Sequence, residues 1–203
     1  FLYEARQLDE NSFLINSSEC LYRIDSSGAE LTKFCLPTPA AGDYLSSHGA
    51  VPLMGGHYGA VTKQGHLFSI RPDGSVAFSV STGVQERVFD LVELSNGNLL
   101  VVGFDKGDVA IVSPQGQIIR RLNVGILLEL PLEIQGQSIV FPALYQTLVT
   151  DLDGLPVRTL QGRYYTSHSH DGPKPMPDGG WVAVSDHTDL VYFDAQGGEL
   201  IKV

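Results

Sequence analysis

The sequence is poor in the residues that mark well-known reactive motifs. Of its 203 residues, two are cysteine, two are methionine and one is tryptophan. It contains no C-x-x-C pair, no glycine-rich phosphate loop and no nucleophile elbow. The usual signatures of cysteine-based zinc or redox sites, of P-loop nucleotide binding and of α/β-hydrolases are therefore missing. Whether the chain is an enzyme is left open by the sequence.

Basic residues and long apolar stretches are also scarce. Lysine and arginine number 13 against 23 acidic residues, which gives a net charge of −10. An acidic surface repels phosphate backbones, so nucleic acid is not expected as a partner. No apolar stretch approaches the roughly 18 residues that a membrane span needs. The chain opens FLYEARQLDE, without an initiator methionine or a basic n-region, so we expect a processed or trimmed product.

A hairpin with a glycine-closed turn recurs along the chain. The turn glycines are Gly28, Gly74, Gly116, Gly154 and Gly197, at intervals of 46, 42, 38 and 43 residues. A strand-built repeat of roughly 40 to 45 residues is typical of a propeller blade with four strands. No stretch shows helical periodicity over more than a turn or two, which argues against a helical repeat of the same length.

The third copy is the clearest. VFDLVEL, NLLVVGF, DVAIVS and QIIRRL read as four strands, separated by the short turns SNG, DKG and PQG. Glycine at the end of such turns supplies the left-handed residue that closes a tight hairpin. The second strands NLLVVGF, SIVFPAL and GWVAVSD are continuously apolar, which favours burial on both faces. The outer strand with Val76, Phe78 and Val80 alternates, so one of its sides should face solvent.

The predicted fold is therefore all-β, a β-propeller with five four-stranded blades in a single domain, residues 1–203. The predicted blades are approximately residues 3–34, 44–80, 87–122, 126–160 and 166–203. Each terminal blade is expected to be complete in itself, without a strand exchanged between the chain ends. Either the ring closes without that latch, or it is open or part of a larger propeller. An open ring exposes apolar blade faces, which would favour a partner or a homodimer.

The pattern of short strands and glycine-containing turns, such as P-D-G-G and S-N-G-N, resembles that of the NHL and PQQ-like repeat propellers. It also resembles the gluconolactonase and arylsulfotransferase propellers. The resemblance covers the whole chain and implies the fold, whereas these groups differ in their sites. PQQ-like repeats usually carry a recurring tryptophan after the second strand; Trp181 is the single tryptophan here, so quinone binding is not expected.

Polar residues recur near the start of the predicted inner strands. Aligning the blades on their first turns places these residues together: Glu4, His48, Asp90, Glu129 and the pair His170 and Asp171. The alignment slips by one residue at His48 and at Asp171. Inner strands line the central channel, so we expect these side chains to converge at one of its mouths. They would either hydrogen-bond water and exposed backbone in the channel or bind a cation or another ligand there.

Two functions follow from this arrangement. The first is a binding or scaffold module that recognises a protein or small-molecule ligand at the channel mouth or on a ring face. Its expected ligand-binding residues are His48, His168 and His170. The resemblance to arylsulfotransferase propellers implies an active-site contribution from histidines placed like the last two. A surface-exposed fragment of a larger propeller protein is a further interpretation.

The second function is a divalent-metal-dependent hydrolase of the lactonase kind. Converging carboxylates repel one another unless a cation compensates them, and Ca²⁺ prefers such oxygen ligands. Gluconolactonase-like propellers hold a divalent cation on the axis, which implies a metal that activates water. The expected ligands are Glu4, Asp90, Glu129 and Asp171. No cofactor is certain from the sequence; Ca²⁺ or another divalent cation is the candidate.

The two cysteines flank one predicted hairpin. If Ile24 pairs with Leu31, then Cys20 faces Cys35 across the ladder, close enough for a disulfide. That disulfide would favour an oxidising compartment, secreted or periplasmic. The alternative is a pair of small buried thiols. Asn16 begins an N-S-S triplet that fits a glycosylation acceptor.

Overall fold

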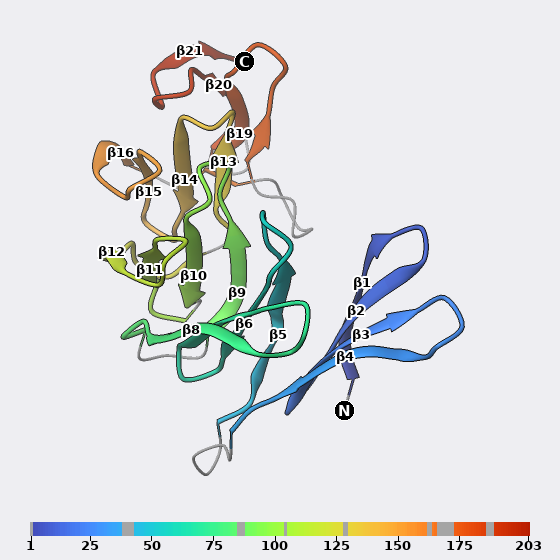
Figure 1. The fold of residues 1–203 in the computed structure, drawn as a ribbon. Coiled ribbons are helices and arrows are strands. Elements are labelled where there is room, and N and C mark those ends of the chain that lie inside the picture. Colours follow the sequence, from blue (N-terminus) through green and yellow to red (C-terminus); the bar gives the residue numbers. More distant parts are fainter. Residues whose placement is uncertain are drawn as a thin grey trace. The chain divides into compact units, whose positions relative to one another are not determined.

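A computed structural model of the chain describes residues 2–37, 43–84, 88–103, 105–127, 130–161, 164–165, 173–185 and 189–203. All regular elements in these ranges are β-strands, which confirms the expected all-β class (Figure 1). Two compact units share the chain. Unit 1 comprises residues 1–93, 97–104 and 109–119, and unit 2 comprises residues 94–96, 105–108 and 120–203.

The strands form consecutive antiparallel meanders, which we call blades one to five in chain order. Blade one contains β1 (Leu2–Asp9), β2 (Ser12–Ser17), β3 (Cys20–Asp25) and β4 (Glu30–Cys35). Blade two contains β5 (Leu45–Pro52), β6 (Tyr58–Thr62), β7 (His66–Ile70) and β8 (Val76–Ser81). Blade three contains β9 (Val88–Glu93), β10 (Leu99–Gly103), β11 (Asp108–Val112) and β12 (Ile118–Asn123).

Blades four and five belong to unit 2. Blade four contains β13 (Leu132–Ile134), β14 (Ser138–Pro142), β15 (Gln146–Thr150) and β16 (Pro156–Gln161). Blade five contains β17 (Tyr164–Tyr165), β18 (Lys174–Pro175), β19 (Trp181–Ser185), β20 (Asp189–Phe193) and β21 (Glu199–Lys202). In blade five the two short strands β17 and β18 both pair antiparallel with β19.

The second strand of a blade is its most buried one. Every residue of β6, β10 and β14 is buried, as expected for apolar strands covered on both faces. The expectation fails for β19, whose burial alternates from Trp181 to Ser185. For the outer strand β8 the expectation is different, that one side faces solvent; Phe78 and Val80 pack against a core, whereas Val76 is exposed.

The hydrophobic cores lie between consecutive sheets. In unit 1, one core joins Leu14 and Phe34 of blade one to Phe68 of blade two, and the two phenylalanine rings lie 5.5 Å apart. A second core joins blades two and three. In unit 2, a third core stacks Trp181 on Phe193 with ring centroids 4.1 Å apart. Within each unit, apolar packing thus holds neighbouring sheets together.

The turn between the third and fourth strands has the same geometry in all five blades. Its glycine has a positive φ in each copy, from 78° at Gly154 to 86° at Gly28. The glycine N–H donates to the carbonyl three residues earlier, for example from Gly28 to Asp25 at 3.0 Å. This turn position therefore requires glycine, because the backbone there is left-handed.

The first residue of this turn supports it with its side chain. Asp25, Ser113, Asp151 and Asp194 each accept hydrogen bonds from the N–H groups two and four residues later. Blade two has an arginine at this position, and Asp73 accepts the Ser75 N–H instead. Short polar side chains favour turns in this way because they hydrogen-bond the local backbone.

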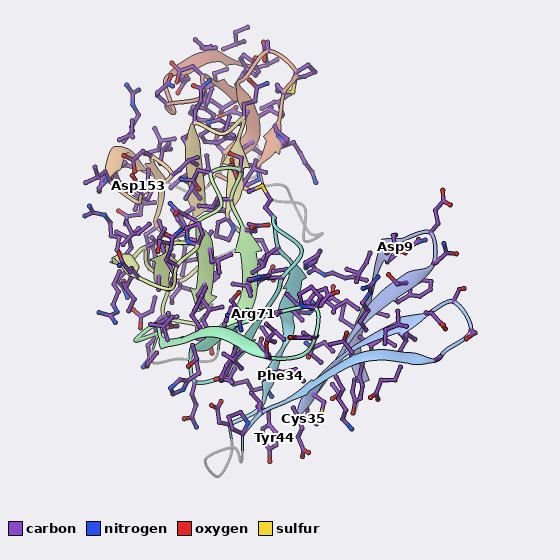
Figure 2. All side chains as sticks on the ribbon, in the orientation of Figure 1. Asp9, Phe34, Cys35, Tyr44, Arg71 and Asp153 are labelled. Carbon is purple, nitrogen blue, oxygen red and sulfur yellow. A yellow bond between two sulfur atoms is a disulfide. The ribbon has the colours of Figure 1, made fainter. Side chains whose placement is uncertain are left out.

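The same turns contact the neighbouring blade. A Cβ added to Gly74 would lie 2.8 Å from the Lys33 carbonyl oxygen, and one added to Gly116 would lie 2.6 Å from the Phe78 ring. In unit 2, Arg120 donates to the carbonyl of Asp153, which lies at the tip of the β15–β16 hairpin (Figure 2). Absence of a side chain on the turn glycine thus lets consecutive blades approach closely.

Candidate functional site

A bulge in β5 joins blades two and three. The β5–β6 ladder pairs Leu45 with Thr62 and then Ala50 with Ala60, so residues 46–49 include extra residues on the β5 side. Within the bulge, His48 pairs in parallel with Asp90 of β9 and merges the two blades into one eight-stranded sheet (Figure 1). Bulges of this kind redirect side chains and are common beside functional sites.

Buried hydrogen bonds hold the bulge in place. The Ser46 hydroxyl donates to the Val88 carbonyl at 2.8 Å, and the Asn16 amide donates to the Ser46 carbonyl at 2.7 Å. A Cβ at Gly49 would lie 2.7 Å from a Val61 methyl carbon, so only glycine fits there. The bulge is therefore tied to β2 of blade one and to β9 of blade three.

Four charged or titratable side chains gather at this point of the inner strands. We call Glu4, Arg6, His48 and Asp90 the inner-strand cluster. The Arg6 Nε donates to Glu4 Oε1 at 2.9 Å, and His48 Nδ1 lies 4.0 Å from Glu4 Oε2. The side chains of Arg6 and His48 are 36% and 48% exposed, whereas that of Glu4 is 24% exposed. The side chains of Arg6 and His48 are thus accessible to a ligand, and Glu4 lies beside both of them.

Asp90 is the buried member of the cluster, with 6% of its surface exposed. Burial raises the pKa of Asp90 from 3.8 to about 6, because desolvation disfavours the carboxylate. The Leu91 N–H, which donates to Asp90 Oδ1 at 2.8 Å, opposes the rise, as do the charges of Arg6 and His48. Asp90 consequently changes its charge in mildly acidic solution.

The structure brings together three of the predicted site residues, Glu4, His48 and Asp90. His48, where the sequence alignment slips by one residue, lies within the β5 bulge. Sequence reasoning missed Arg6, although it lies two positions after Glu4 and so on the same face of β1. The ligand and metal roles of these residues remain predictions.

The other predicted site residues, Glu129, His168, His170 and Asp171, lie outside the described residues. Across the described ranges, no group of three or more His, Cys, Asp and Glu side chains is arranged to hold a metal ion.

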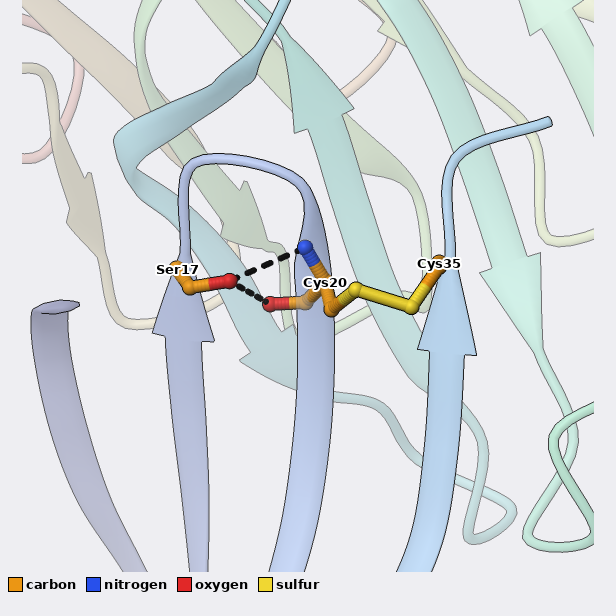
Figure 3. The surroundings of a disulfide bond; sticks show 3 residues. All are labelled: Ser17, Cys20 and Cys35. Atoms are coloured by element: carbon orange, nitrogen blue, oxygen red, sulfur yellow. Dashed lines mark hydrogen bonds between the residues drawn. A yellow bond between two sulfur atoms is a disulfide. The ribbon is translucent and has the colours of Figure 1, made fainter. Parts of the chain in front are cut away.

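Cys20 and Cys35 form a disulfide between β3 and β4, with Cα atoms 4.1 Å apart (Figure 3). Beside it, the Ser17 hydroxyl accepts from the Cys20 N–H and donates to the Cys20 carbonyl. The predicted facing of the two cysteines is confirmed. The predicted pairing of Ile24 with Leu31 is wrong, because a bulge after Arg23 pairs Ile24 with Glu30 instead.

Two further sequence expectations meet the structure here. Asn16 begins the triplet that fits a glycosylation acceptor, but its side chain is 1% exposed and its amide donates to the Ser46 carbonyl. A glycan on this amide would not fit in the folded chain. In the part of the chain that the structure describes, no helix has the length and apolarity to span a membrane.

The sequence matches no known protein family, and no curated protein is significantly similar to it. Solved structures do match. The C-terminal WD40 domain of Sif2 aligns over 97% of this chain and 58% of its own, with 9% identity and a TM-score of 0.73. BamB from Moraxella catarrhalis aligns over 98% and 60%, with 14% identity and a TM-score of 0.68.

Virginiamycin B lyase from Staphylococcus aureus aligns over 100% of this chain and 69% of its own, with 13% identity and a TM-score of 0.64. The chain therefore spans less than two thirds of the Sif2 domain and of BamB, and somewhat more of the lyase. At such low identity the likeness concerns the fold and not the activity. Together with the consecutive four-stranded sheets, it shows that this chain has the β-propeller fold.

Proposed function

We propose that the chain is a binding module that recognises a protein or small-molecule ligand through the inner-strand cluster. The observation that carries the proposal is a buried oxygen, Glu4 Oε2, which has no hydrogen-bond donor among the described residues. A buried acceptor left without a donor costs roughly 1 to 3 kcal/mol. A ligand that donates a hydrogen bond to Glu4 Oε2, once a neighbouring side chain such as His48 turns aside to expose it, would remove this cost. Arg6 and His48 are exposed enough to contact the same ligand.

The cluster favours a ligand group that both donates and accepts hydrogen bonds. Glu4 offers an acceptor, and the Arg6 guanidinium has N–H groups beyond the one that contacts Glu4. A carboxamide or a peptide amide satisfies both requirements, with its N–H toward Glu4 and its carbonyl toward Arg6. Such groups occur both in protein partners and in small molecules.

A direct test uses nuclear magnetic resonance with a mixture of capped tripeptide amides as the probe. We expect binding to shift the ring resonances of His48. Glu4→Gln and Arg6→Ala should each weaken binding by about tenfold or more, because a charge-assisted hydrogen bond is lost. Glu10→Gln is the matched control, since Glu10 is exposed at the turn of the same hairpin and should leave binding unchanged.

The same samples are assayed for turnover of lactones and esters. The proposal would be abandoned if the protein hydrolysed these substrates and Asp90→Ala abolished the reaction while Glu10→Gln did not. It would also be abandoned if Glu4→Gln and Arg6→Ala left peptide binding unchanged.

The metal-dependent hydrolase remains a prediction, because two of its four expected ligands lie outside the described residues. We also propose, from the Cys20–Cys35 disulfide, that the chain works in an oxidising compartment such as the periplasm or the extracellular space. A homodimer formed through exposed blade faces likewise stays a prediction, which measurement of the solution mass would test.

A further inference from the structure

A polar pocket lies in unit 2, where turns of blades four and five meet. Its volume is about 270 Å³, close to the lower end of the roughly 300 to 1,000 Å³ typical of small-molecule sites. The β13–β14 turn, the β18–β19 turn and the β20–β21 turn all contribute to its walls. The pocket contains no residue of the inner-strand cluster.

The lining of the pocket is rich in carboxamides. Gln135, Gln137 and Gln196 line it, and Gln196 Nε2 donates to Gln137 Oε1 at 3.2 Å. Each amide carries two N–H donors and a carbonyl acceptor. The contact uses one N–H of Gln196, so the N–H groups of Gln137 and the carbonyl of Gln196 are left for another molecule. Asp178 and Asp194 add carboxylate acceptors, and none of the described residues that line the pocket is a lysine or an arginine. The pocket is therefore unsuited to phosphates and other anions.

An aromatic ring in the pocket has a fixed position. The Tyr192 hydroxyl donates a short hydrogen bond to Asp178 Oδ2, and the Gly180 N–H donates to Asp178 Oδ1. The bond with Tyr192 lowers the pKa of Asp178 and raises the pKa of Tyr192, so the carboxylate and the phenol keep these forms around neutral pH. With Leu200, the tyrosine supplies the apolar part of the lining.

The backbone at the pocket is strained. Gln135 has φ of 44°, and it is the one non-glycine with positive φ among the residues described. A left-handed backbone is unfavourable for a residue with a side chain, and strain of this kind concentrates at functional sites. The side chain of Gln135 donates to the Pro177 carbonyl at 3.3 Å, which ties the blade-four turn to the blade-five turn. The pocket is thus held in shape by contacts across both turns.

We propose that this pocket binds a neutral saccharide. Sugar hydroxyls both donate and accept hydrogen bonds, which matches glutamine amides paired with carboxylates. The C–H face of a sugar ring packs on Tyr192 and Leu200. This site is separate from the inner-strand cluster, and its occupancy does not depend on the function proposed there.

Titration calorimetry with glucose, galactose, N-acetylglucosamine and cellobiose tests the proposal. We expect at least one of them to bind with a Kd of about 1 mM or lower. Gln196→Leu and Gln137→Leu should each weaken that sugar by about tenfold, since each removes an amide that pairs with hydroxyls. Gln161→Leu, at an exposed position of β16, is the matched control and should bind as the unaltered chain does.

Three results would overturn the saccharide site. None of the four sugars binds, both pocket variants bind the sugar as tightly as the unaltered chain, or the Gln161→Leu control loses as much sugar affinity as they do. Saturation by CaCl₂ alone, with no response to sugar, would also overturn it and would indicate a cation site. Circular dichroism confirms that Gln196→Leu and Gln137→Leu are folded. Glu4→Gln should leave sugar binding unchanged, which separates this test from that of the inner-strand cluster.

Discussion

At the scale of single residues, Asp90 carries the largest electrostatic cost that the structure shows. Its pKa is about 6 in the folded chain, against 3.8 for an ordinary aspartate. Between these values the folded state holds a proton that the unfolded state releases, so stability falls as the pH rises. Above about pH 6 the full cost is present, roughly 3 kcal/mol. A group kept at such a cost is a good candidate for a functional role.

Replacing Asp90 by asparagine should remove this cost. We expect Asp90→Asn to raise the free energy of unfolding by about 1 to 3 kcal/mol near pH 7.5, with little change near pH 4. The gain is below the full cost because the asparagine amide is itself a polar group, and its burial also costs free energy. Urea unfolding of both proteins at several pH values measures the difference. A difference that does not vary with pH would show that Asp90 ionises normally.

Counting from the turns brings some site residues together even where their strands are irregular. Register shifts lie beside Glu4 in β1 and beside Asp90 in β9, and both residues still lie near His48. His48 itself lies in the bulged part of β5, which counting from the turn does not reveal. Gln135 gave no signal, since a sequence rule expects glycine or asparagine, not glutamine, at a left-handed position. Strain of that kind is imposed by the surrounding structure.

At the scale of elements, the repeated turn combines a local requirement with a contact to the next blade. Gly28 and Gly116 have nearly the same φ, 86° and 83°. A Cβ at Gly28 would meet no atom within 4 Å, whereas one at Gly116 would lie 2.6 Å from the Phe78 ring. The two positions therefore separate the cost of the backbone conformation from the cost of the contact.

Alanine at these two glycines should have unequal effects. Gly28→Ala should lower the free energy of unfolding by about 1 to 2 kcal/mol, the cost of a left-handed residue with a side chain. Gly116→Ala should cost about 1 to 3 kcal/mol more, because the ring or the backbone must move. Chemical denaturation followed by circular dichroism compares them. Equal losses would mean that the contact between blades two and three adjusts freely.

Strand order and turn position could be predicted because hydrophobic alternation and turn glycines are local signals. Register could not. The hairpin of β3 and β4 was expected to pair Ile24 with Leu31, yet a bulge shifts that pair and still leaves Cys20 opposite Cys35. A bulge depends on how the strand twists against its neighbours, which no short window of sequence contains.

At the scale of the whole molecule, the disulfide limits how far the unfolded chain can expand. It closes a loop of 15 residues between Cys20 and Cys35. A loop of that length removes roughly 3 kcal/mol of unfolded-state entropy. The cross-link acts within unit 1, whose blade one packs on blade two through an apolar core.

Loss of the cross-link should be measurable. We expect Cys20→Ala with Cys35→Ala to lower the free energy of unfolding by about 2 to 4 kcal/mol, and dithiothreitol to do the same to the unaltered chain. Urea unfolding with and without the reductant gives the value. Dithiothreitol should not affect the double variant, which is the control. Alkylation of native, unreduced protein at both cysteines would contradict the bond itself.

The left-handed turn glycines have a consequence for how such a chain changes over evolutionary time. Where such a glycine contacts the preceding blade, the contact requires that its own side chain be absent, and at Gly74 the partner is the backbone carbonyl of Lys33. Contacts of this sort place almost no restriction on neighbouring side chains. Substitutions elsewhere in the chain can then accumulate while the spacing of the turns, and with it the stacking of the blades, is kept.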